Sequence, residues 1–490
     1  MDTTLTRQQR QAFLSGLHVF VRQDLGVVFD PDTLAFFKVD AQTGHLLQDL
    51  RNGSPAEEVT AKYHRPAAEV EQFLAALQSE TRRQAELRPA KVYDTGLLGE
   101  RLIVLVSQTC NMRCRYCNAG GGNYGQESGL MTPETARQAL ETFIQDGRFL
   151  FQGVQFFGGE PTLNVPAVRT ICEHLHQAHR QRRIAALPWF TLITNGLVMN
   201  DEFVQLVRDY AIKVTVSVDG PQALHDRHRL DRAGQGTYQR VIDNVARLRA
   251  ATDGQQPEAI EATVTRHHLD AGMTHAGLQA FFAQELDIHR THLALIEGGY
   301  DMAGRVSEAE RTQWLIDAQA SVIDDLQRGE PQASTLGLRL LKKLIFKRIS
   351  PYICPVGIAA LTVNVNGAIY PCYQLMDNPF SMGHVAQTQP WQTPAYQEVV
   401  QKLRANDKFH NVHCRDCWAR GVCSGCLGEL YAGTGSIEGR IEANCNGIRG
   451  GVEEVLYGLV KLRSDADRWA AMLAKLNSEF KRADSAAEVY

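Results

Sequence analysis

The chain has 490 residues, of which 44% are hydrophobic and 22% are charged, and its formal net charge is −4. This composition is typical of a globular protein of about three domains, and it excludes a strongly basic chain built to bind nucleic acid or an anionic membrane surface. No apolar run is long enough to span a bilayer and the first residues lack the apolar core of a signal peptide, so we expect a soluble, cytoplasmic protein.

The N-terminal segment predicts a small mixed module. Residues 17–37 alternate short apolar runs with turn signals, which indicates an antiparallel sheet. Three helical patterns follow between residues 43 and 77, and Ser54, three residues before Glu57, predicts a capping box. Three strands and three helices indicate a winged helix within residues 1–95, which could be a structural cap, bind DNA or capture an extended peptide by strand addition. Its helices carry acidic side chains as freely as basic ones, which weakens the DNA interpretation.

Beyond this module, strands alternate with amphipathic helices, the pattern of a parallel α/β sheet. The predicted strands cover residues 101–107, 154–157, 188–194, 213–219, 260–265 and 291–297. Six such units predict a partial (β/α)6 barrel of TIM-like architecture within residues 96–305, whose functional residues should follow the carboxyl ends of the strands. A helical bridge over 306–350, a cysteine-rich segment over 351–450 and C-terminal helices over 451–490 complete the chain.

The eleven cysteines are unevenly distributed. A disulfide framework is not expected in a reducing cytoplasm, so two clusters of cysteines in different domains indicate metal chemistry. Three cysteines lie between residues 110 and 117, and seven lie between residues 354 and 445. Cys172 stands alone in a helical pattern, and we interpret it as a packed core thiol.

Cys110, Cys114 and Cys117 form a C-x3-C-x2-C motif directly after the first predicted barrel strand. A closed zinc site would need a fourth ligand, and no His or Cys follows before Cys172. Three buried core thiols are a second alternative, although the following stretch, NAGGGNYGQ, is polar and rich in glycine. The third interpretation is a [4Fe–4S] cluster with three cysteine ligands and one open iron, which can bind a small chelating molecule.

This cysteine loop resembles that of the radical S-adenosylmethionine (radical SAM) enzymes. In that family the amino and carboxylate groups of the methionine moiety occupy the open iron, and the reduced cluster cleaves the sulfonium to give a 5′-deoxyadenosyl radical. Two further stretches carry the resemblance. VQFFGGEP at 154–161 matches the family's GGE motif, and SVDGPQALHDRHR at 217–229 is similar to its S-x-D-G-P…H-D…R stretch.

The resemblance implies a set of residues around S-adenosylmethionine. They are Gly158, Gly159, Glu160, Asn195, Ser217, Asp219 and Arg240. Glu160 would accept a hydrogen bond from the ammonium group, Asn195 would contact the ribose and Arg240 the carboxylate. Ser217 would lie near the cofactor and Asp219 would shape the loop. A structural turn or a surface charge is the alternative for each of these residues.

The seven C-terminal cysteines resemble the SPASM extension of peptide-modifying radical enzymes, although zinc ribbons also pair C-x2-C motifs. Gly367 lies in the Gly-x4-Cys motif of that extension. The resemblance implies two auxiliary iron–sulfur clusters. Their ligands would be Cys414, Cys417, Cys423 and Cys445 for one cluster, and Cys354, Cys372 and Cys426 for the other.

Two departures from the sulfatase-maturing members of this family bear on the reaction. Those members carry an extra cysteine shortly after the first one, where this chain reads CPVGIAALTV, so the cluster of Cys354 is expected to have an open iron that could take a substrate thiolate. They also place an Asp directly after the Gly-x4-Cys motif, where this chain has Tyr373, which argues against formylglycine chemistry.

The stretches NYGQESGLM, YPCYQLMDNPFSMGHV and CRDCWARGVCSGC are similar to maturases that install thioether cross-links, such as the ranthipeptide, sactipeptide and quinohemoprotein amine dehydrogenase maturation enzymes. The resemblance implies a radical SAM enzyme that joins a Cys sulfur to a carbon within a ribosomally made peptide or small protein subunit. Residues 15–90 would bind the leader of that peptide, and a flavodoxin or ferredoxin would donate electrons. A carbon–carbon cross-link or an epimerisation is the alternative reaction. A zinc-stabilised, winged-helix DNA-binding regulator is the alternative of a different class.

Overall fold

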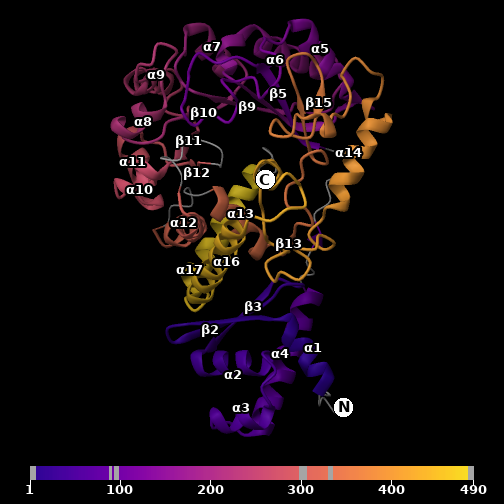
Figure 1. Ribbon diagram of the computed structural model, residues 1–490, viewed down its shortest axis with the longest axis vertical. Helices are drawn as coiled ribbons and strands as arrows, with labels where there is room; N and C mark the ends of the chain where they lie inside the picture. Colours follow the sequence, from indigo (N-terminus) through magenta and orange to yellow (C-terminus); the bar gives the residue numbers. More distant parts are fainter. Residues whose placement is uncertain (1–6, 88–90, 93–98, 297–305, 329–334, 484–490) are drawn as a thin grey trace.

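The computed structural model describes residues 7–87, 91–92, 99–296, 306–328 and 335–483. Figure 1 shows an N-terminal domain at one end of the molecule and a large curved sheet with its outer helices at the other. The C-terminal half of the chain lies between and beside these two parts. The last residue of the strand predicted over 291–297 lies outside the described residues.

The N-terminal domain is built as its sequence predicts, from a three-stranded antiparallel sheet and helices. Its elements are α1 (Arg7–Gly16), β1 (His18–Arg22), β2 (Leu25–Asp30), β3 (Ala35–Asp40), α2 (Ala41–Arg51), α3 (Ala56–Lys62) and α4 (Ala67–Leu87). The capping box predicted at Ser54 is wrong, because α3 begins after Pro55 and has no side-chain cap. The structure instead places a cap at Asp40, whose side chain accepts a hydrogen bond from the Thr43 N–H at the start of α2.

Six parallel strands form the barrel sheet, and all six fall where the sequence predicts them. They are β5 (Gly99–Ser107), β8 (Phe151–Gly158), β9 (Trp189–Thr194), β10 (Lys213–Ser217), β11 (Ala259–Val264) and β12 (Thr291–Leu295). The helices of this region are α5 (Pro133–Thr142), α6 (Val165–Arg180), α7 (Asp201–Asp209), α8 (Gln222–His228), α9 (Tyr238–Ala251), α10 (Arg266–Asp270) and α11 (His275–Leu286). Cys172 is fully buried in α6, as predicted.

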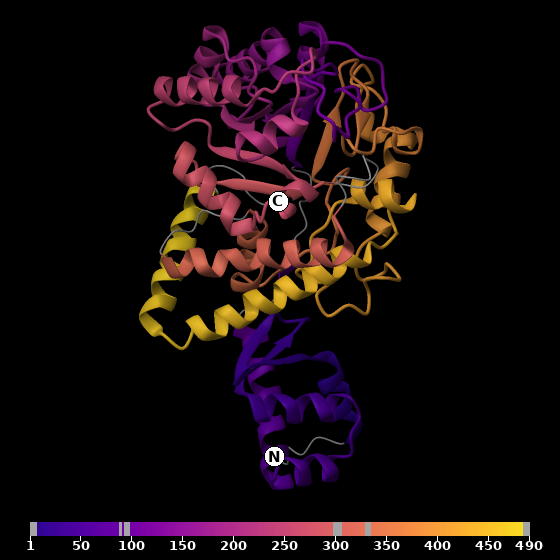
Figure 2. The same cartoon turned by 60° about the vertical axis from the view of Figure 1, so that its left-hand side comes forward.

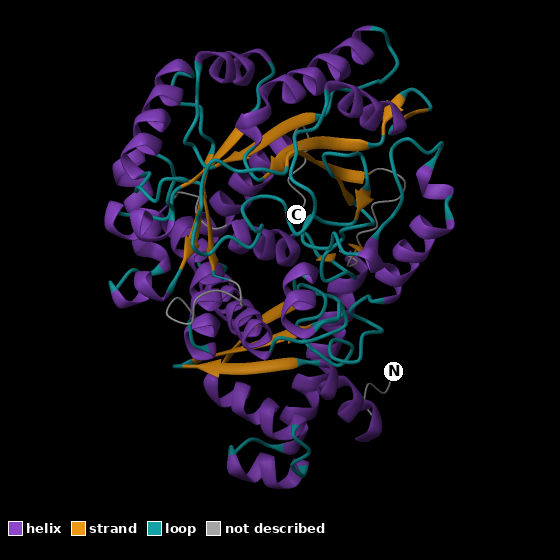
Figure 3. Cartoon of the chain, turned by 45° about the horizontal axis from the view of Figure 1, so that its top comes forward, coloured by secondary structure: helices purple, strands orange, loops and turns teal. Residues whose placement is uncertain are grey.

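Alternate residues of these strands face opposite sides of the sheet. In β11 the buried residues Ile260, Ala262 and Val264 alternate with partly exposed ones, and β9 and β10 follow the same rule. The buried series belongs to the main hydrophobic core, which also contains residues of α6, α7 and α9. The other series therefore lines the concave side of the sheet, where the strands curve around an interior seen in Figure 3.

The cysteine-rich segment joins this sheet, which the sequence did not predict. Strand β14 (Ala360–Val363) pairs in parallel with β5, and β15 (Ile369–Tyr370) pairs antiparallel with β14. The sheet thus has eight strands in the order β12-β11-β10-β9-β8-β5-β14-β15. Short two-residue strands form two further ladders, β13 (Arg348–Ile349) with β4 (Lys91–Val92), and β6 (Ile144–Gln145) with β7 (Arg148–Phe149). The auxiliary segment is therefore fixed to the barrel by backbone hydrogen bonds.

The remaining helices are α12 (Glu308–Arg328), α13 (Thr335–Ile345), α14 (Pro394–Ala405), α15 (Leu427–Thr434), α16 (Glu442–Leu462) and α17 (Ala466–Ala483). Residues of α12, α13, α16 and α17 pack with the N-terminal sheet, whereas residues of α14 and α15 belong to the barrel core. Figure 2 shows α12 and α16 side by side above the N-terminal domain. Glycines of α16 allow this approach, since a Cβ at Gly447 would lie 2.6 Å from the Leu315 side chain.

One hydrophobic core joins the N-terminal sheet to these helices. It contains Val27 and Phe29 of β2, Leu341 of α13 and Val455 of α16, all fully buried. A second core on the other face of the sheet contains residues of α2, α3 and α4. The N-terminal sheet is therefore covered on both faces. No helix among the described residues is long and apolar enough to cross a membrane.

Candidate functional site

The barrel cysteine group, Cys110, Cys114 and Cys117, lies on the loop that follows β5. The register of β5 against β8 shifts between Leu105 and Ser107, immediately before this loop. All three cysteines are free and partly buried. Burial raises the pKa of Cys114 to about 12, and the charges of the other two thiols act in the same direction. A metal that binds such a thiol must displace its proton.

The segment after α8 holds this cysteine loop in place. Backbone hydrogen bonds of 2.8 and 3.0 Å join residues 113–115 to residues 228–230. The Arg232 guanidinium donates to the carbonyl oxygen of Cys110, with Nε at 2.9 Å and Nη2 at 2.6 Å. Arg232 is a positioning residue that the sequence analysis missed, although it lies only three residues beyond the 217–229 stretch.

Glycines allow the GGE segment to touch the cysteine loop. Gly158 and Gly122 have φ values of +136° and +110°, which L side chains rarely adopt. A Cβ at Gly122 would lie 2.6 Å from the Gly159 Cα, and one at Gly159 would collide with the Thr109 carbonyl oxygen. These glycines let two backbone segments approach each other beside the cysteines. We call the space that they leave open the cradle, and a side chain at Gly122, Gly158 or Gly159 would fill it.

Glu160 is fully buried at the centre of a hydrogen-bond network between two strand ends. Its carboxylate accepts hydrogen bonds from the backbone N–H groups of Thr162 at 2.9 Å and Asn195 at 2.7 Å, and from the Thr194 hydroxyl at 2.7 Å. Burial raises the pKa of the Glu160 carboxyl, and these three donors oppose that rise. The Asn195 side chain in turn lies 3.6 Å from the Cys110 sulfur. Glu160 and Asn195 are therefore brought to the cysteine loop, as the family motif implied.

Asp219 is fully buried and organises the loop after β10. It accepts a hydrogen bond of 2.6 Å from the hydroxyl of Tyr116, which lies between two cysteines of the motif, and one of 3.1 Å from the Thr263 N–H. Arg229 lies 3.6 Å from the carboxylate and donates to the Tyr116 oxygen at 2.7 Å. This network supports the predicted role of Asp219 in shaping the loop, and it adds Tyr116 as its partner.

The remaining two predicted contact residues differ in position. Ser217 ends β10 and is in register with Glu261 of β11, which is itself in register with His292 of β12. These three form a polar row across the concave face of the sheet, and the sequence analysis missed Glu261 and His292. Arg240 instead pairs with Asp231 at 2.6 Å on the exposed side of α9, with half of its side chain in solvent. Arg240 thus contacts Asp231, which forms a backbone bridge with Met112 of the cysteine loop.

The distal cysteine group consists of Cys414, Cys417, Cys423 and Cys445. The charges of the other three thiols act on the pKa of Cys414, so the four cysteines lie close together. Cys445 joins them from α16, a separate element further along the chain. Burial and these neighbouring thiols raise the pKa of Cys414 to about 11. The resemblance to the SPASM extension implied this set.

The proximal cysteine group consists of Cys354, Cys372 and Cys426, between the barrel and the distal group. Burial and the neighbouring Cys354 thiol raise the pKa of Cys372. Burial and the thiols of Cys372 and Cys426 raise the pKa of Tyr373, so these groups lie close together. Backbone N–H groups donate hydrogen bonds to two of these sulfurs. The Leu427 N–H donates to Cys354, and the Glu429 N–H donates to Cys426 at 3.4 Å. Such N–H donors stabilise cluster thiolates.

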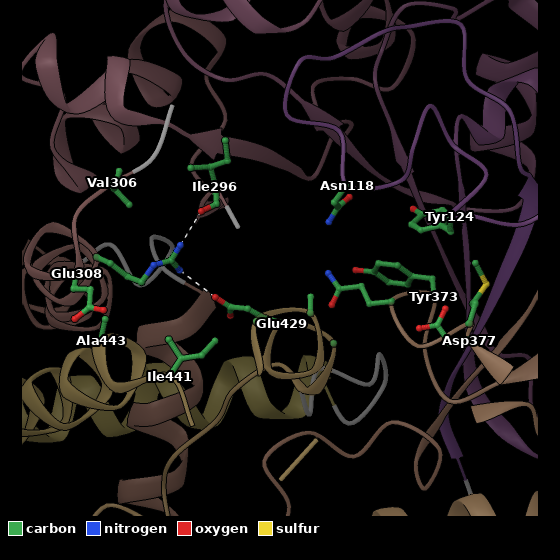
Figure 4. Close-up of a pocket in the computed structure, with 16 residues that line it drawn as sticks. Asn118, Tyr124, Ile296, Val306, Glu308, Tyr373, Asp377, Glu429, Ile441 and Ala443 are labelled. Carbon is green, nitrogen blue, oxygen red and sulfur yellow. Dashed lines mark hydrogen bonds and ion pairs between the residues drawn. The ribbon is translucent and has the colours of Figure 1, made fainter. Parts of the chain in front are cut away.

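A cavity of about 660 Å³ lies between the barrel and proximal groups. Asn118 and Tyr124 of the cysteine loop line it together with Tyr373, whose ring lies 5.6 Å from that of Tyr124 between centroids (Figure 4), and Gln374 also belongs to the lining. The Gln374 side-chain oxygen lies 2.9 Å from the Cys426 sulfur, and Asn118 directly follows Cys117. One cavity is therefore bounded by neighbours of both groups.

An ion pair crosses the opposite wall of this cavity. Arg311 of α12 lies 3.1 Å from Glu429 of α15, and it also donates to the carbonyl oxygen of Ile296 at 2.7 Å (Figure 4). Both side chains are mostly buried, with 17% and 19% exposed. The pair ties the end of β12 to the auxiliary segment and places fixed charges of both signs in the cavity wall.

Among the described residues, no group of three or more His, Cys, Asp or Glu side chains is arranged to hold a single metal ion. Thiols with backbone N–H groups directed at them can hold an iron–sulfur cluster, and the three cysteines of the barrel and proximal groups are one fewer than a closed zinc site takes.

Comparisons with known protein families agree with this arrangement. Residues 104–259 match the radical SAM superfamily, and residues 354–418 match the SPASM iron–sulfur cluster-binding domain. The first match contains the barrel cysteine group and all seven predicted contact residues. The second contains four of the seven auxiliary cysteines: Cys354, Cys372, Cys414 and Cys417.

Two curated relatives match about a third of this chain. A cysteine-type anaerobic sulfatase-maturating enzyme of Clostridium novyi is 26% identical over 152 residues, which cover 29% of this chain and 38% of the relative. The radical SAM cyclopropyl synthase TigE of Paramaledivibacter caminithermalis is 24% identical over 184 residues, which cover 35% of this chain and 37% of the relative. The matches span less than half the length of these relatives.

A solved structure shares the fold over a longer part of the chain. Native anSMEcpe with bound AdoMet superposes with a TM-score of 0.60 at 19% identity, covering 74% of this chain and 99% of that one. The same protein has been solved with AdoMet and a Cp18Cys peptide, with a TM-score of 0.57. The likeness extends the shared architecture beyond the barrel into the auxiliary segment.

Proposed function

We propose that this chain, which carries a radical SAM domain and a SPASM domain, is a maturase that forms thioether cross-links in a ribosomally made peptide or protein subunit. The observation that carries the proposal is the single cavity bounded by neighbours of the barrel and proximal cysteine groups. When bound, the barrel cluster and S-adenosylmethionine supply a 5′-deoxyadenosyl radical, which removes a hydrogen atom from a substrate carbon.

The chain's own residues prepare the barrel side of this reaction. Arg232 fixes the carbonyl of Cys110, and the glycines at 122, 158 and 159 leave room for the cofactor beside the cysteines. Glu160 and Asn195 complete the cradle with buried hydrogen-bonding groups. These contacts would orient the methionine end of S-adenosylmethionine, and Ser217 would face the interior next to it.

The proximal group would hold the sulfur. It has three cysteines, so a four-iron cluster bound there keeps one iron without a cysteine ligand. A substrate thiol bound at this iron would lose its proton, and when the thiolate couples to the substrate carbon radical, one electron would pass to the cluster. Tyr373 and Gln374 lie at the junction of this group and the cavity, where they would guide the substrate cysteine.

The N-terminal domain would bind the leader of the substrate through residues 15–90. β3 is an edge strand of its sheet, and it contacts α4, so an extended peptide could add beside it. The peptide bound in the related anSMEcpe structure supports a peptide substrate here. A flavodoxin or ferredoxin as electron donor, and a cytoplasmic location, belong to the same proposal.

Thiol labelling distinguishes the thioether from the alternative reactions. The reduced and reconstituted protein is incubated with S-adenosylmethionine and a cysteine-containing peptide encoded beside its gene, and the product is alkylated before mass spectrometry. A thioether should remove two hydrogen atoms and also one alkylatable thiol per cross-link, because the sulfur is then bonded to carbon. A carbon–carbon cross-link would remove the hydrogens but leave the thiol, and epimerisation would leave the mass unchanged. Either of these results would overturn thioether formation.

A further inference from the structure

Two lysines lie inside the protein against the backbone of the distal cysteine group. Lys408 is fully buried, and its Nζ donates to the carbonyl oxygen of Cys423 at 2.6 Å. Lys343 of α13 reaches the same turn from another element, with its Nζ 2.6 Å from the Ser424 hydroxyl and 3.2 Å from the Val422 carbonyl oxygen. Both ammonium groups are therefore held by neutral oxygen acceptors at one turn of the chain.

No carboxylate pairs with either lysine among the described residues. The charged groups that act on Lys408 are the thiols of Cys423, Cys414 and Cys417. An ammonium group buried without a counter-charge is unfavourable, so an anion at this position would stabilise the charged form of both lysines. Four thiolates around an iron–sulfur cluster carry a net negative charge, and the distal group supplies all four.

The proximal cysteine group has a different environment. Its neighbours include Tyr373 and the Gln374 amide, which are neutral, and the guanidinium groups of Arg101 and Arg339 act on Cys354. The distal group therefore has two ammonium groups beside it, whereas the cations that act on Cys354 of the proximal group are guanidinium groups.

We propose that Lys343 and Lys408 raise the reduction potential of the iron–sulfur cluster held by the distal group. Reduction adds a negative charge to a cluster that is already anionic, and fixed positive charges in a low-dielectric interior stabilise this added charge. This inference rests on the proposed function, since it requires that the distal group binds an iron–sulfur cluster.

The test is a potentiometric titration of full-length, anaerobically reconstituted protein, followed by electron paramagnetic resonance. The distal signal is assigned by its absence in Cys417→Ala. Lys408→Met and Lys343→Met should each lower the midpoint potential of that signal, with a change in the reduction equilibrium of about tenfold, or about 59 mV for one electron. Lys408→Arg, which keeps the charge, should stay near the wild-type midpoint. Lys402→Met, at an exposed position of α14, is the matched control and should change nothing.

The outcomes separate this inference from the proposed function. Unchanged midpoints in both methionine variants with full iron content would overturn the electrostatic role. Loss of the distal iron in both variants would assign the lysines to scaffolding and would overturn it as well. Zinc instead of iron in the distal group of the wild-type protein would overturn the cluster assignment itself, and metal analysis reveals this without any midpoint measurement.

Discussion

Replacing Cys110, Cys114 and Cys117 together by Ala should abolish reductive cleavage of S-adenosylmethionine. The three thiols share one loop between β5 and α5, and no other cysteine of the described chain lies on it. Without them the cluster that carries the chemistry cannot bind, so we expect 5′-deoxyadenosine formation to fall at least about a thousandfold, equivalent to about 4 kcal/mol of barrier.

The same variant should keep the auxiliary clusters. The proximal and distal groups are built from segments between Cys354 and Cys445, and β14 fixes them to the sheet independently of the cysteine loop. Of about twelve irons expected for three clusters, about eight should remain, and the protein should still be brown. Undiminished 5′-deoxyadenosine, or loss of all iron, would contradict the assignment of the barrel group.

Replacing Cys372 by Ala should separate radical formation from cross-linking. Cys372 is 8% exposed and belongs to the proximal group, on the opposite side of the cavity from the barrel group. Because the cysteine loop after β5 is left intact, 5′-deoxyadenosine formation should stay within about threefold of wild type, while thioether formation should fall at least about a hundredfold. Both quantities can be followed in one incubation by chromatography and mass spectrometry.

Cys172→Ala provides the matched control for this experiment. Cys172 is a buried cysteine in α6 that belongs to none of the three groups, so the same substitution there removes a sulfur without touching a cluster. It should cost about 1 kcal/mol of stability and leave both activities in place. Wild-type cross-linking by Cys372→Ala would show that the proximal group does not hold the substrate sulfur.

The barrel could be predicted from the sequence because its signals are local. Each strand is a short apolar run of the right length, and the polar motifs follow the strands at which the structure places them. The hydrogen bonds of Glu160 and Asp219 follow from that placement, since the carboxyl ends of neighbouring parallel strands meet at one edge.

The features that escaped prediction depend on contacts between distant segments. The pairing of β14 with β5 joins residues 360–363 to 101–104, and nothing in either segment marks its partner. Arg232 and Arg240 lie close together on the chain, and only the path of the backbone sends one to Cys110 and the other to Asp231. The shared core between the N-terminal sheet and α16 is equally non-local. The proposed boundary at residue 450 therefore falls within a continuous helix.

The most direct test of peptide maturation by this chain follows hydrogen from the substrate into the cofactor product. A cysteine-containing peptide encoded beside the gene is prepared with deuterium on its carbon atoms and incubated anaerobically with reduced protein and S-adenosylmethionine. Since the radical removes a hydrogen atom from a substrate carbon, deuterium should appear in 5′-deoxyadenosine in step with the cross-linked peptide. Cross-linked peptide accompanied by deuterium-free 5′-deoxyadenosine would contradict the account.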